Sequence, residues 1–453
     1  MKFYSTLDSF ISSLATALWG LPLIIILLGG GIYFALFSRM IQLLYFRHAI
    51  HVLLGRYDSK DDLGQISHFE ALSSALAGTV GMGNIAGVAV AIHTGGPGAI
   101  FWMWLTAIVG MSTKFFTCTL SIMYRGKDDQ GQIQGGVMYF IEEGLGKPYR
   151  PLAVLFSISG LFGCIVFFQA NQLSQIIREY LYTPIGLFQD SPLLGDMITG
   201  FIIAIIVGSV IFGGIKRIAK VASRLVPIMV GFYLMAAVVI LIRNINIVPD
   251  IFLLIIDDAF TGNAVSGGAL GSMIIIGVRR GMFSNEAGTG TETMAHGAAK
   301  TNEPVREGLV AMLGPFIDTI LVCSITALVI LISGVYNQDL NGVSMTAAAF
   351  KKELGLPGQI FLTVSVLTFA LSTMFGYSYY GQKCATYLFG SNWRKYYNWF
   401  YILMIVIASC ASIDIAINFV DSAYALMVIP TMISTFLLAP RVMDEARRYF
   451  STL

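Results

Sequence analysis

A glycine-rich stretch inside an apolar segment is the first place where this sequence could do chemistry. Residues 78–87 read GTVGMGNIAG, and Gly78, Gly81 and Gly83 fall in the middle of the segment 68–94. Glycine destabilises a helix interior by roughly 1 kcal/mol relative to alanine, so three glycines predict a break. Unwound carbonyls can coordinate a cation, and the amides that open a half-helix can hold an anionic group. The stretch therefore predicts a discontinuous helix that binds small ligands.

Two other interpretations of these glycines are a phosphate-binding loop and close helix packing. The run GMGNIAG has one residue too many for the GxGxxG pattern, and no GK[ST] follows it, which argues against phosphate binding. Small residues spaced four apart, such as Gly83 and Gly87, also let helices approach closely. The local sequence leaves this packing role open.

Ionisable residues inside apolar segments form a second group that could do chemistry. Arg279, Arg280 and Glu286 lie in the segment 264–298, and Asp318 lies in the run GPFIDTILV. Charges within a membrane are costly, so such residues mark ion paths, proton carriers or gates. We expect Arg279 and Arg280 to pair with Glu286 in support of an inner gate. Asp318 is either a proton carrier or a structural carboxylate bonded to a nearby donor.

The composition indicates that a bilayer surrounds these residues. The chain has 453 residues, of which 56% are hydrophobic and 12% charged, against about 25% charged in soluble domains. The net charge of +2 gives no indication of a nucleic-acid partner. Apolar runs long enough to cross a bilayer predict one all-α transmembrane domain over 1–453 with about eleven spans, at 20–46, 68–94, 98–124, 151–181, 195–215, 220–244, 264–298, 303–334, 357–388, 396–413 and 418–439.

Lysine and arginine are distributed unevenly between alternate loops. One set of alternate loops holds eighteen of these residues, and the other set holds only four, Lys2, Arg243, Lys351 and Lys352. Because positive charges stay in the cytoplasm, the count predicts an outside N-terminus and a cytoplasmic C-terminus. The cytoplasmic group has eighteen members: Arg47, Arg56, Lys60, Arg125, Lys127, Lys147, Arg150, Lys216, Arg217, Lys220, Arg224, Lys300, Arg306, Arg394, Lys395, Arg441, Arg447 and Arg448.

Patterns for enzyme chemistry and metal binding are missing from the sequence. It contains neither HExxH nor GxSxG, so we do not expect an enzyme or a resident cofactor. The five histidines lie at predicted span ends or in loops without metal-ligand spacing, and we expect them at the membrane interface: His48, His51, His68, His93 and His296.

A second segment also carries helix-breaking residues. The run GVRRG at 277–281 precedes FSNEAGTGTET, which predicts a break near residue 278. Transporters built from inverted repeats have glycine-interrupted helices at corresponding positions of both halves. If 20–46 is an extra N-terminal helix, the other ten spans divide into repeats at 68–244 and 264–439, each opened by a broken helix. Five spans per repeat require the second repeat to be inverted.

Several ordered blocks resemble the alanine or glycine:cation symporter family. The run GGPGAIFWMWLTAIVG (95–110) is similar to the family signature, and further blocks are SSALAGTVGMGNIAGVA, QGGVMYF, FFQANQL, GVRRGMFSNEAGTG and GYSYYGQKC. Together they cover about residues 66 to 390. The resemblance implies a leucine-transporter-like fold with a five-plus-five inverted repeat. It also implies uptake of a small neutral amino acid, driven by Na⁺ or H⁺, across a prokaryotic inner membrane.

The resemblance also implies where the amino acid would bind. Backbone amides at the first break suit a carboxylate, Gln169 can bond both the ammonium and the carboxylate, and Ile276 and Tyr377 would wall a pocket that suits alanine or glycine. Gln169 could instead make an interhelical hydrogen bond. The implied substrate set is Gly78, Thr79, Met82, Gly83, Gln169, Ile276, Gly277, Thr373 and Tyr377.

A sodium site is implied between the first broken helix and the span 357–388. The run TFALST offers a carbonyl and two hydroxyls one helical turn later, although such hydroxyls also bond back to the preceding turn. Asn84 and Thr79 could serve a second cation. The implied ligands are the carbonyls of Ala77, Val80 and Phe369 and the hydroxyls of Ser372 and Thr373.

Two alternatives to Na⁺ symport stay open at this point. Asp318 could carry the coupling ion in an H⁺-driven symporter, as could Asp414 or Asp421. A channel could use the broken helices as a filter, but repeated carbonyl motifs and rings of charge are missing from the sequence. The sequence contains no feature that indicates an oligomeric state.

Overall fold

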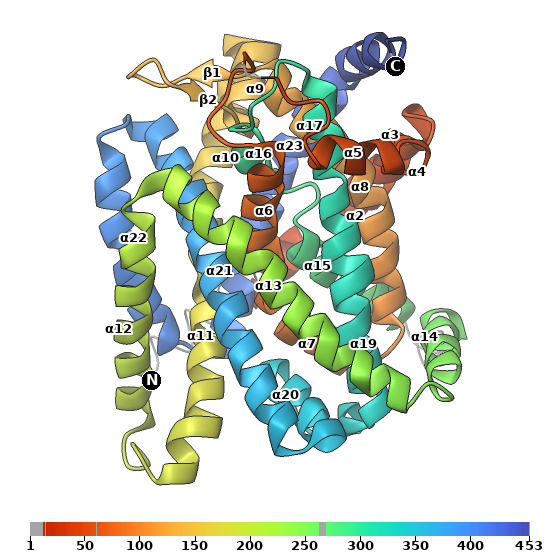
Figure 1. The fold of residues 1–453 in the computed structure, drawn as a ribbon, viewed down its shortest axis with the longest axis vertical. Helices are drawn as coiled ribbons and strands as arrows, with labels where there is room; N and C mark the ends of the chain where they lie inside the picture. Colours follow the sequence, from red (N-terminus) through yellow and green to blue (C-terminus); the bar gives the residue numbers. More distant parts are fainter. Residues whose placement is uncertain (1–11, 14, 60, 262–268, 453) are drawn as a thin grey trace.

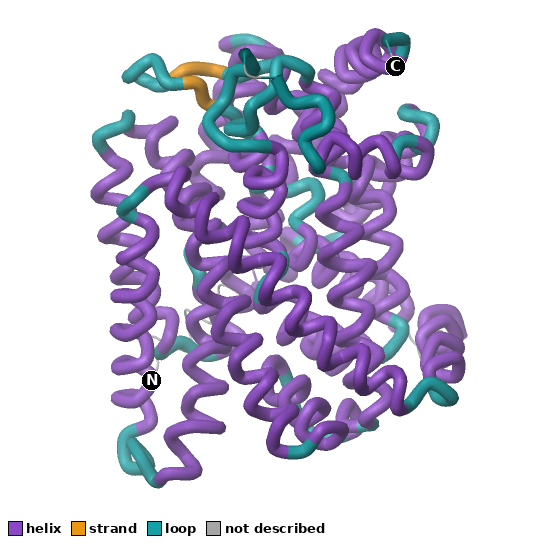
Figure 2. The backbone as a smooth tube through the Cα atoms, in the orientation of Figure 1, coloured by secondary structure: helices purple, strands orange, loops and turns teal. Residues whose placement is uncertain are grey.

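The computed structural model describes residues 12–13, 15–59, 61–261 and 269–452, and almost all of its regular structure is helical (Figures 1 and 2). Seven described helices are long and apolar enough to cross a membrane, or eight if one bent pair counts as a single span. They include α8 (Ala99–Met123), α12 (Pro192–Ile211), α13 (Gly214–Arg243), α21 (Leu356–Phe389) and α23 (Ile413–Phe450). These findings support a multi-pass membrane protein.

Three of the eleven expected spans are shorter than that within the described residues. The segment Leu21–Phe37, α15 (Ala269–Asn285) and α22 (Trp393–Ser409) are helices of 17 residues each. The first consists of α2 (Leu21–Ile24), η1 (Ile25–Gly29) and α3 (Gly30–Phe37). It ends before residue 46 because Arg39 and Met40 have positive φ values of 55° and 60°, and the short helices α4 (Ile41–Leu44) and α5 (Phe46–Leu53) follow.

The first discontinuous helix lies where the glycines predict it. Helix α6 (His68–Thr79) and the pair η2 (Gly83–Gly87) and α7 (Val88–Gly95) are bent by 50° at the break. A capping box between Ser67 and Glu70 begins α6. Helices α13 and α21 pack against α6, and α15 packs against α7. The broken backbone is thus surrounded by protein, the only setting in which it is stable at membrane depth.

The second discontinuity is not where the sequence predicts it. Helix α15 continues through 277–281, and the irregular segment runs from Glu286 to Glu292 before α16 (Thr293–His296). Positive φ values of 56° at Glu286, 93° at Gly288 and 83° at Gly290 end the helix. Gly277 instead allows close packing of α15 against α8, because a Cβ at this position would lie 2.5 Å from the Trp102 Cβ.

A further interruption falls inside the expected span 151–181. Helix α10 (Arg150–Gly163) ends at Cys164, and α11 (Phe167–Ile177) begins after Val166. The remaining elements include a small hairpin and short connecting helices. Their bounds are β1 (Gly126–Lys127), β2 (Ile133–Gln134), α9 (Val137–Leu145), η3 (Lys147–Tyr149), η4 (Arg178–Tyr182), η5 (Thr183–Ile185), α14 (Val248–Thr261), α17 (Pro304–Ala311), α18 (Leu313–Pro315), η6 (Phe316–Cys323), α19 (Ser324–Ser333), η7 (Val335–Asn337) and α20 (Gly342–Leu354).

Two ends of the molecule can be distinguished in Figure 1. Strands β1 and β2, α9, α5 and the end of α23 lie at one end, uppermost in the view, while α14 and α20 lie toward the other. Large apolar side chains are exposed on α12, α13 and α22 between these ends, among them Ile205, Ile228, Met235 and Trp399. Such a surface suits contact with lipid.

Candidate functional site

The break in α6 faces the middle of α21. An added Cβ at Gly376 would lie 3.0 Å from the Gly78 nitrogen, and one at Gly78 would lie 3.3 Å from the Tyr377 ring. A Cβ at Gly81 would overlap the Thr373 hydroxyl. Glycine at these positions therefore lets the two backbones approach closely, and the first break is also a packing contact.

Oxygen atoms gather at this contact. The hydroxyls of Ser372 and Thr373 both donate to the Phe369 carbonyl, at 2.8 and 3.1 Å. Ala77 lies in the last turn of α6 and Val80 is its C-cap, where the helix ends at Thr79 and its last carbonyls lose their helical partners. All five expected sodium ligands are buried: Ala77, Val80, Phe369, Ser372 and Thr373. The structure thus brings α21 and the break together.

Asn84 and Thr79, the residues suggested for a second cation, are engaged otherwise. The Asn84 Oδ1 accepts the Gly81 amide at 2.8 Å, and its Nδ2 donates to Asp318 Oδ1 at 2.7 Å. The Thr79 hydroxyl donates to the Ala75 carbonyl at 3.3 Å. Asn84 therefore holds the broken backbone and links it to Asp318.

Asp318 is fully buried and joins three elements. Besides Asn84, the hydroxyls of Ser284 and Thr319 donate to its Oδ2 at 2.8 and 2.7 Å. Both Asn84 and Asp318 lie in π-helical turns, η2 and η6, which are rare and frequent at functional sites. The carboxylate accepts three side-chain hydrogen bonds, as the structural interpretation predicts, and it also touches the break.

The irregular segment after α15 is organised by Glu286. Its carboxylate accepts hydrogen bonds from Tyr377 and Thr291, and Tyr424 donates at 3.4 Å. Tyr377 belongs to α21, Thr291 to the irregular segment and Tyr424 to α23. The expected pairing of Glu286 with Arg279 and Arg280 is wrong.

Both arginines bind Asp421 of α23 instead. Arg280 forms a buried ion pair with Asp421, and Arg279 Nη2 lies 2.6 Å from the same carboxylate. The Trp19 indole donates to the Asp421 carbonyl at 3.0 Å. Arg279 and Arg280 lie in the last turns of α15, before the break, so they face α23 rather than the irregular segment.

The remaining substrate candidates divide into two groups. Gln169 lies in the first turn of α11, beside the interruption at 164–166, and its buried Oε1 has no partner within the described residues. Gly83 lies against Ser284, because a Cβ added to Gly83 would lie 3.2 Å from the Ser284 Cα. Met82 is buried. Ile276 and Gly277 instead pack against Gly95 and α8, away from the second break.

Two histidines expected at the interface are buried. The Nδ1 atoms of His68 and His296 each bond one oxygen of Glu307, which is itself buried. His68 begins α6, His296 ends α16 and Glu307 lies in α17. The backbone adds to this cluster, since the Gln65 amide donates to the Ala298 carbonyl at 2.8 Å. We call these three side chains the His–Glu–His cluster. It joins the first residue of α6 to the last residue of α16, so it connects the two discontinuous helices at the end of the molecule that holds β1 and β2 (Figure 1).

Sequence reasoning missed this cluster, Asp421 as a pairing partner and Lys114. Lys114 lies in the middle of α8 and is 2% exposed, and no hydrogen bond or ion pair of its ammonium group is found in the part of the chain that is described. It interacts electrostatically with Glu286 and Asp318. A lysine in an apolar run is a signal that the sequence offers, whereas the pairings depend on contacts distant in sequence.

Comparison with known proteins identifies the fold and the family of this chain. The crystal structure of MhsT in complex with L-phenylalanine matches with a TM-score of 0.57 at 14% identity, over 83% of this chain and 89% of that chain, so the fold is leucine-transporter-like. AgcS of Methanococcus maripaludis, a sodium/alanine symporter, is 40% identical over 450 residues, 97% of each chain. GlnT of Bacillus subtilis, described as a probable sodium/glutamine symporter, is 36% identical over 95% of this chain and 88% of its own. Residues 4–453 match the model of the sodium:alanine symporter family. The chain therefore belongs to the sodium:alanine symporter family, whose members are transporters and not enzymes, as the resemblance predicts.

Proposed function

We propose that this chain imports a small neutral amino acid, alanine or glycine, together with Na⁺. The observation that carries the proposal is the contact between the α6 break and α21, where Gly81 leaves room for the Thr373 hydroxyl and the Phe369 carbonyl beside the broken backbone. Family membership and the sodium/alanine symporter AgcS support the ion and the substrate.

In this mechanism the chain uses its own oxygens to join two elements. Carbonyls of Ala77, Val80 and Phe369 and the hydroxyls of Ser372 and Thr373 hold Na⁺, which keeps the broken helix against α21. The amides that open η2, around Met82 and Gly83, then face the amino-acid carboxylate, with Gln169 and Tyr377 beside it and Gly78 and Thr79 at the turn. Ile276 and Gly277 support the site from the packing between α15 and α8.

Transport follows from movement between two halves of the molecule. We infer a single domain with an extra N-terminal helix and inverted repeats at 68–244 and 264–439. The end with β1 and β2 faces the cytoplasm, and the N-terminus is outside. One half rocks against the other and releases both ligands inward. Each Na⁺ that enters gains about 2.3 kcal/mol per 100 mV.

A second candidate is coupling to H⁺ through Asp318, because this buried carboxylate contacts Asn84 within the break. Uptake of labelled alanine into proteoliposomes separates the two, with an Na⁺ gradient or a pH gradient at clamped voltage. We expect accumulation with Na⁺ alone, and competition by unlabelled glycine but not by glutamine. Accumulation with a pH gradient alone would contradict Na⁺ coupling, and strong competition by glutamine would contradict the small substrate.

A further inference from the structure

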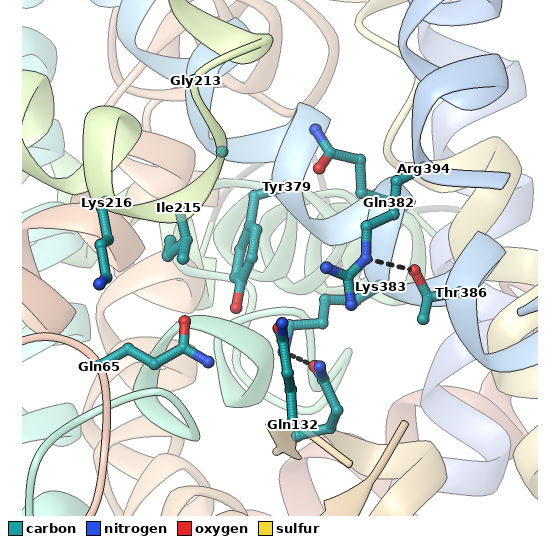
Figure 3. A pocket seen from close by; sticks show the side chains of 12 residues that line it. Gln65, Gln132, Gly213, Ile215, Lys216, Tyr379, Gln382, Lys383, Thr386 and Arg394 are labelled. Atoms are coloured by element: carbon teal, nitrogen blue, oxygen red, sulfur yellow. Dashed lines mark hydrogen bonds between the residues drawn. The ribbon is translucent and has the colours of Figure 1, made fainter. Parts of the chain in front are cut away.

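A cavity of 270 Å³, lined largely by polar residues, lies apart from the α6–α21 contact (Figure 3). Two of the family-like blocks, QGGVMYF and GYSYYGQKC, meet there, and the role proposed above for α21 uses only Tyr377 of the second block. The cavity is lined by Gln65, Gln132, Gln134, Gly213, Gly214, Ile215, Lys216, Tyr379, Gln382, Lys383, Thr386 and Arg394. Lys383 follows Thr373 by ten residues on one helix, which is about 15 Å. The cavity is therefore a separate site.

The cavity holds an excess of positive charge. Lys383 is 5% exposed, donates to the neutral amide oxygen of Gln134 and lies over the Tyr379 ring at 5.2 Å. Arg394 pairs with Asp128 at 2.6 Å. The carboxylate of Asp128 also accepts the Gln134 amide at 2.7 Å, so it is fully engaged. Within the described residues, no carboxylate forms an ion pair with Lys383.

Two buried hydrogen-bonding groups of the cavity have no partner in the described chain. The Nε2 of Gln382 and the hydroxyl of Tyr379 are buried and have no partner in the described chain, at 7% and 6% exposure of their residues. An ammonium group has three donors, and Lys383 uses one of them on Gln134. Figure 3 shows the Tyr379 hydroxyl and the Gln65 amide turned toward the same part of the cavity. Unpartnered buried polar groups are rare and call for a ligand or water.

We propose that this cavity binds the carboxylate of a small organic acid, an amino acid included. A carboxylate supplies acceptor oxygens for these donors and a counter-charge for Lys383. Lys383 is the buried cation of this lining, whereas Lys216 is exposed. One buried cation flanked by neutral donors suits a single negative charge better than a phosphate dianion. The volume lies just below the usual range for larger ligands, which begins at about 300 Å³, so the ligand is small.

Binding of [1-¹³C]acetate to the full chain in nanodiscs tests the proposal, with NMR line broadening as the readout and Na⁺-free buffer throughout. In the proposed function the substrate site depends on Na⁺, so a failure in Na⁺-free buffer is distinct from a failure of Na⁺ symport. We expect acetate to bind and neutral methyl acetate not to bind. Lys383→Met should weaken acetate binding about tenfold or more, since hydrogen bonds to charged groups are strong. Lys395→Met, with the same charge change at an exposed residue outside the cavity, should leave it unchanged.

A second variant and two competition experiments show whether the bound carboxylate can come from an amino acid, and keep the test valid if one variant misfolds. Gln382→Leu removes a neutral donor and should weaken acetate binding severalfold, which tests the site even if Lys383→Met does not fold. Alanine should displace acetate and alaninamide, which lacks the carboxylate, should not; acetate binding that alanine leaves intact would restrict the site to other organic acids. Equal binding of methyl acetate, tighter binding of inorganic phosphate, or full acetate binding by folded Lys383→Met would overturn the proposal.

Discussion

At the residue scale, Gln169 presents a buried amide oxygen that has no partner in the described residues. It lies in the first turn of α11, beside an interruption that the sequence did not reveal. A buried acceptor without a partner costs about 1–3 kcal/mol. The ammonium of a bound amino acid would satisfy this acceptor, so its interhelical alternative has no support from a described contact.

Gln169→Leu should therefore weaken alanine binding about tenfold, because a hydrogen bond to a charged group is worth about 1.5–3 kcal/mol. Equilibrium binding of labelled alanine in saturating Na⁺ measures this. Gln189→Leu, in the exposed loop before α12, is the matched control and should bind as wild type. Unchanged alanine affinity in Gln169→Leu would remove Gln169 from the substrate site.

Asp318→Asn tests the second residue whose role is open. Three side-chain donors point at this carboxylate, and an asparagine would turn one acceptor oxygen into a donor. We expect a loss of about 1–3 kcal/mol in the free energy of unfolding and slower uptake that still follows the Na⁺ gradient. If the variant transported alanine without any response to Na⁺ or pH gradients, Asp318 would be the coupling residue.

At the scale of the elements, two arginines of α15 share one aspartate of α23. Removing one partner from a buried ion pair leaves uncompensated charge and costs about 3–5 kcal/mol. Asp421→Asn should lower the thermal stability of the detergent-solubilised protein accordingly. Asp414→Asn changes the same helix at an exposed position and should have little effect. Equal melting temperatures for the two variants would show that the Arg–Asp contact is unimportant.

The elements also show how far the sequence could be interpreted. Gly78, Gly81 and Gly83 correctly predict the first break. The second was misplaced because Gly277 serves helix packing against Trp102, while Gly288 and Gly290 have the left-handed φ values that end α15. The sequence does not distinguish a glycine that allows close packing from one that ends a helix. Only the spatial neighbours and the φ values distinguish these two roles, so hydropathy and spacing could not place the second break.

The contacts between distant segments were beyond the sequence for the same reason. His68 and Glu307 are 239 residues apart, and Arg280 and Asp421 are 141 apart. A histidine at a predicted span end looks interfacial until its partner is known. By contrast, the run TFALST indicated its own geometry, since its carbonyl and hydroxyls lie within one helical turn.

At the scale of the whole molecule, the His–Glu–His cluster closes one end of the bundle. It joins α6, α16 and α17, and the bridge between Ile66 and Ala299 lies beside it. Because each broken helix contributes one histidine, the cluster holds the two proposed repeats together at the end with β1 and β2.

Glu307→Ala should therefore release both helix ends. Hydrogen–deuterium exchange should rise in residues 64–79 and 293–301 and stay unchanged in α22, which lies elsewhere. Glu303→Ala, in the neighbouring turn and paired with exposed Arg448, serves as the control. A uniform rise over the whole chain would indicate general destabilisation, and no rise at either helix end would contradict the role of the cluster in closure.

The most direct test of the account is the alanine dissociation constant measured against Na⁺ concentration in wild type, Ser372→Ala, Thr373→Ala and the control Thr368→Ala, whose hydroxyl donates to the Val364 carbonyl and not to Phe369. Coupling between two ligands is reciprocal in binding free energy. We predict that Na⁺ tightens alanine binding in wild type and Thr368→Ala, and that the two site variants need more Na⁺ and bind alanine more weakly. Alanine binding that responds to Na⁺ as in wild type in both site variants would contradict a sodium site between α6 and α21.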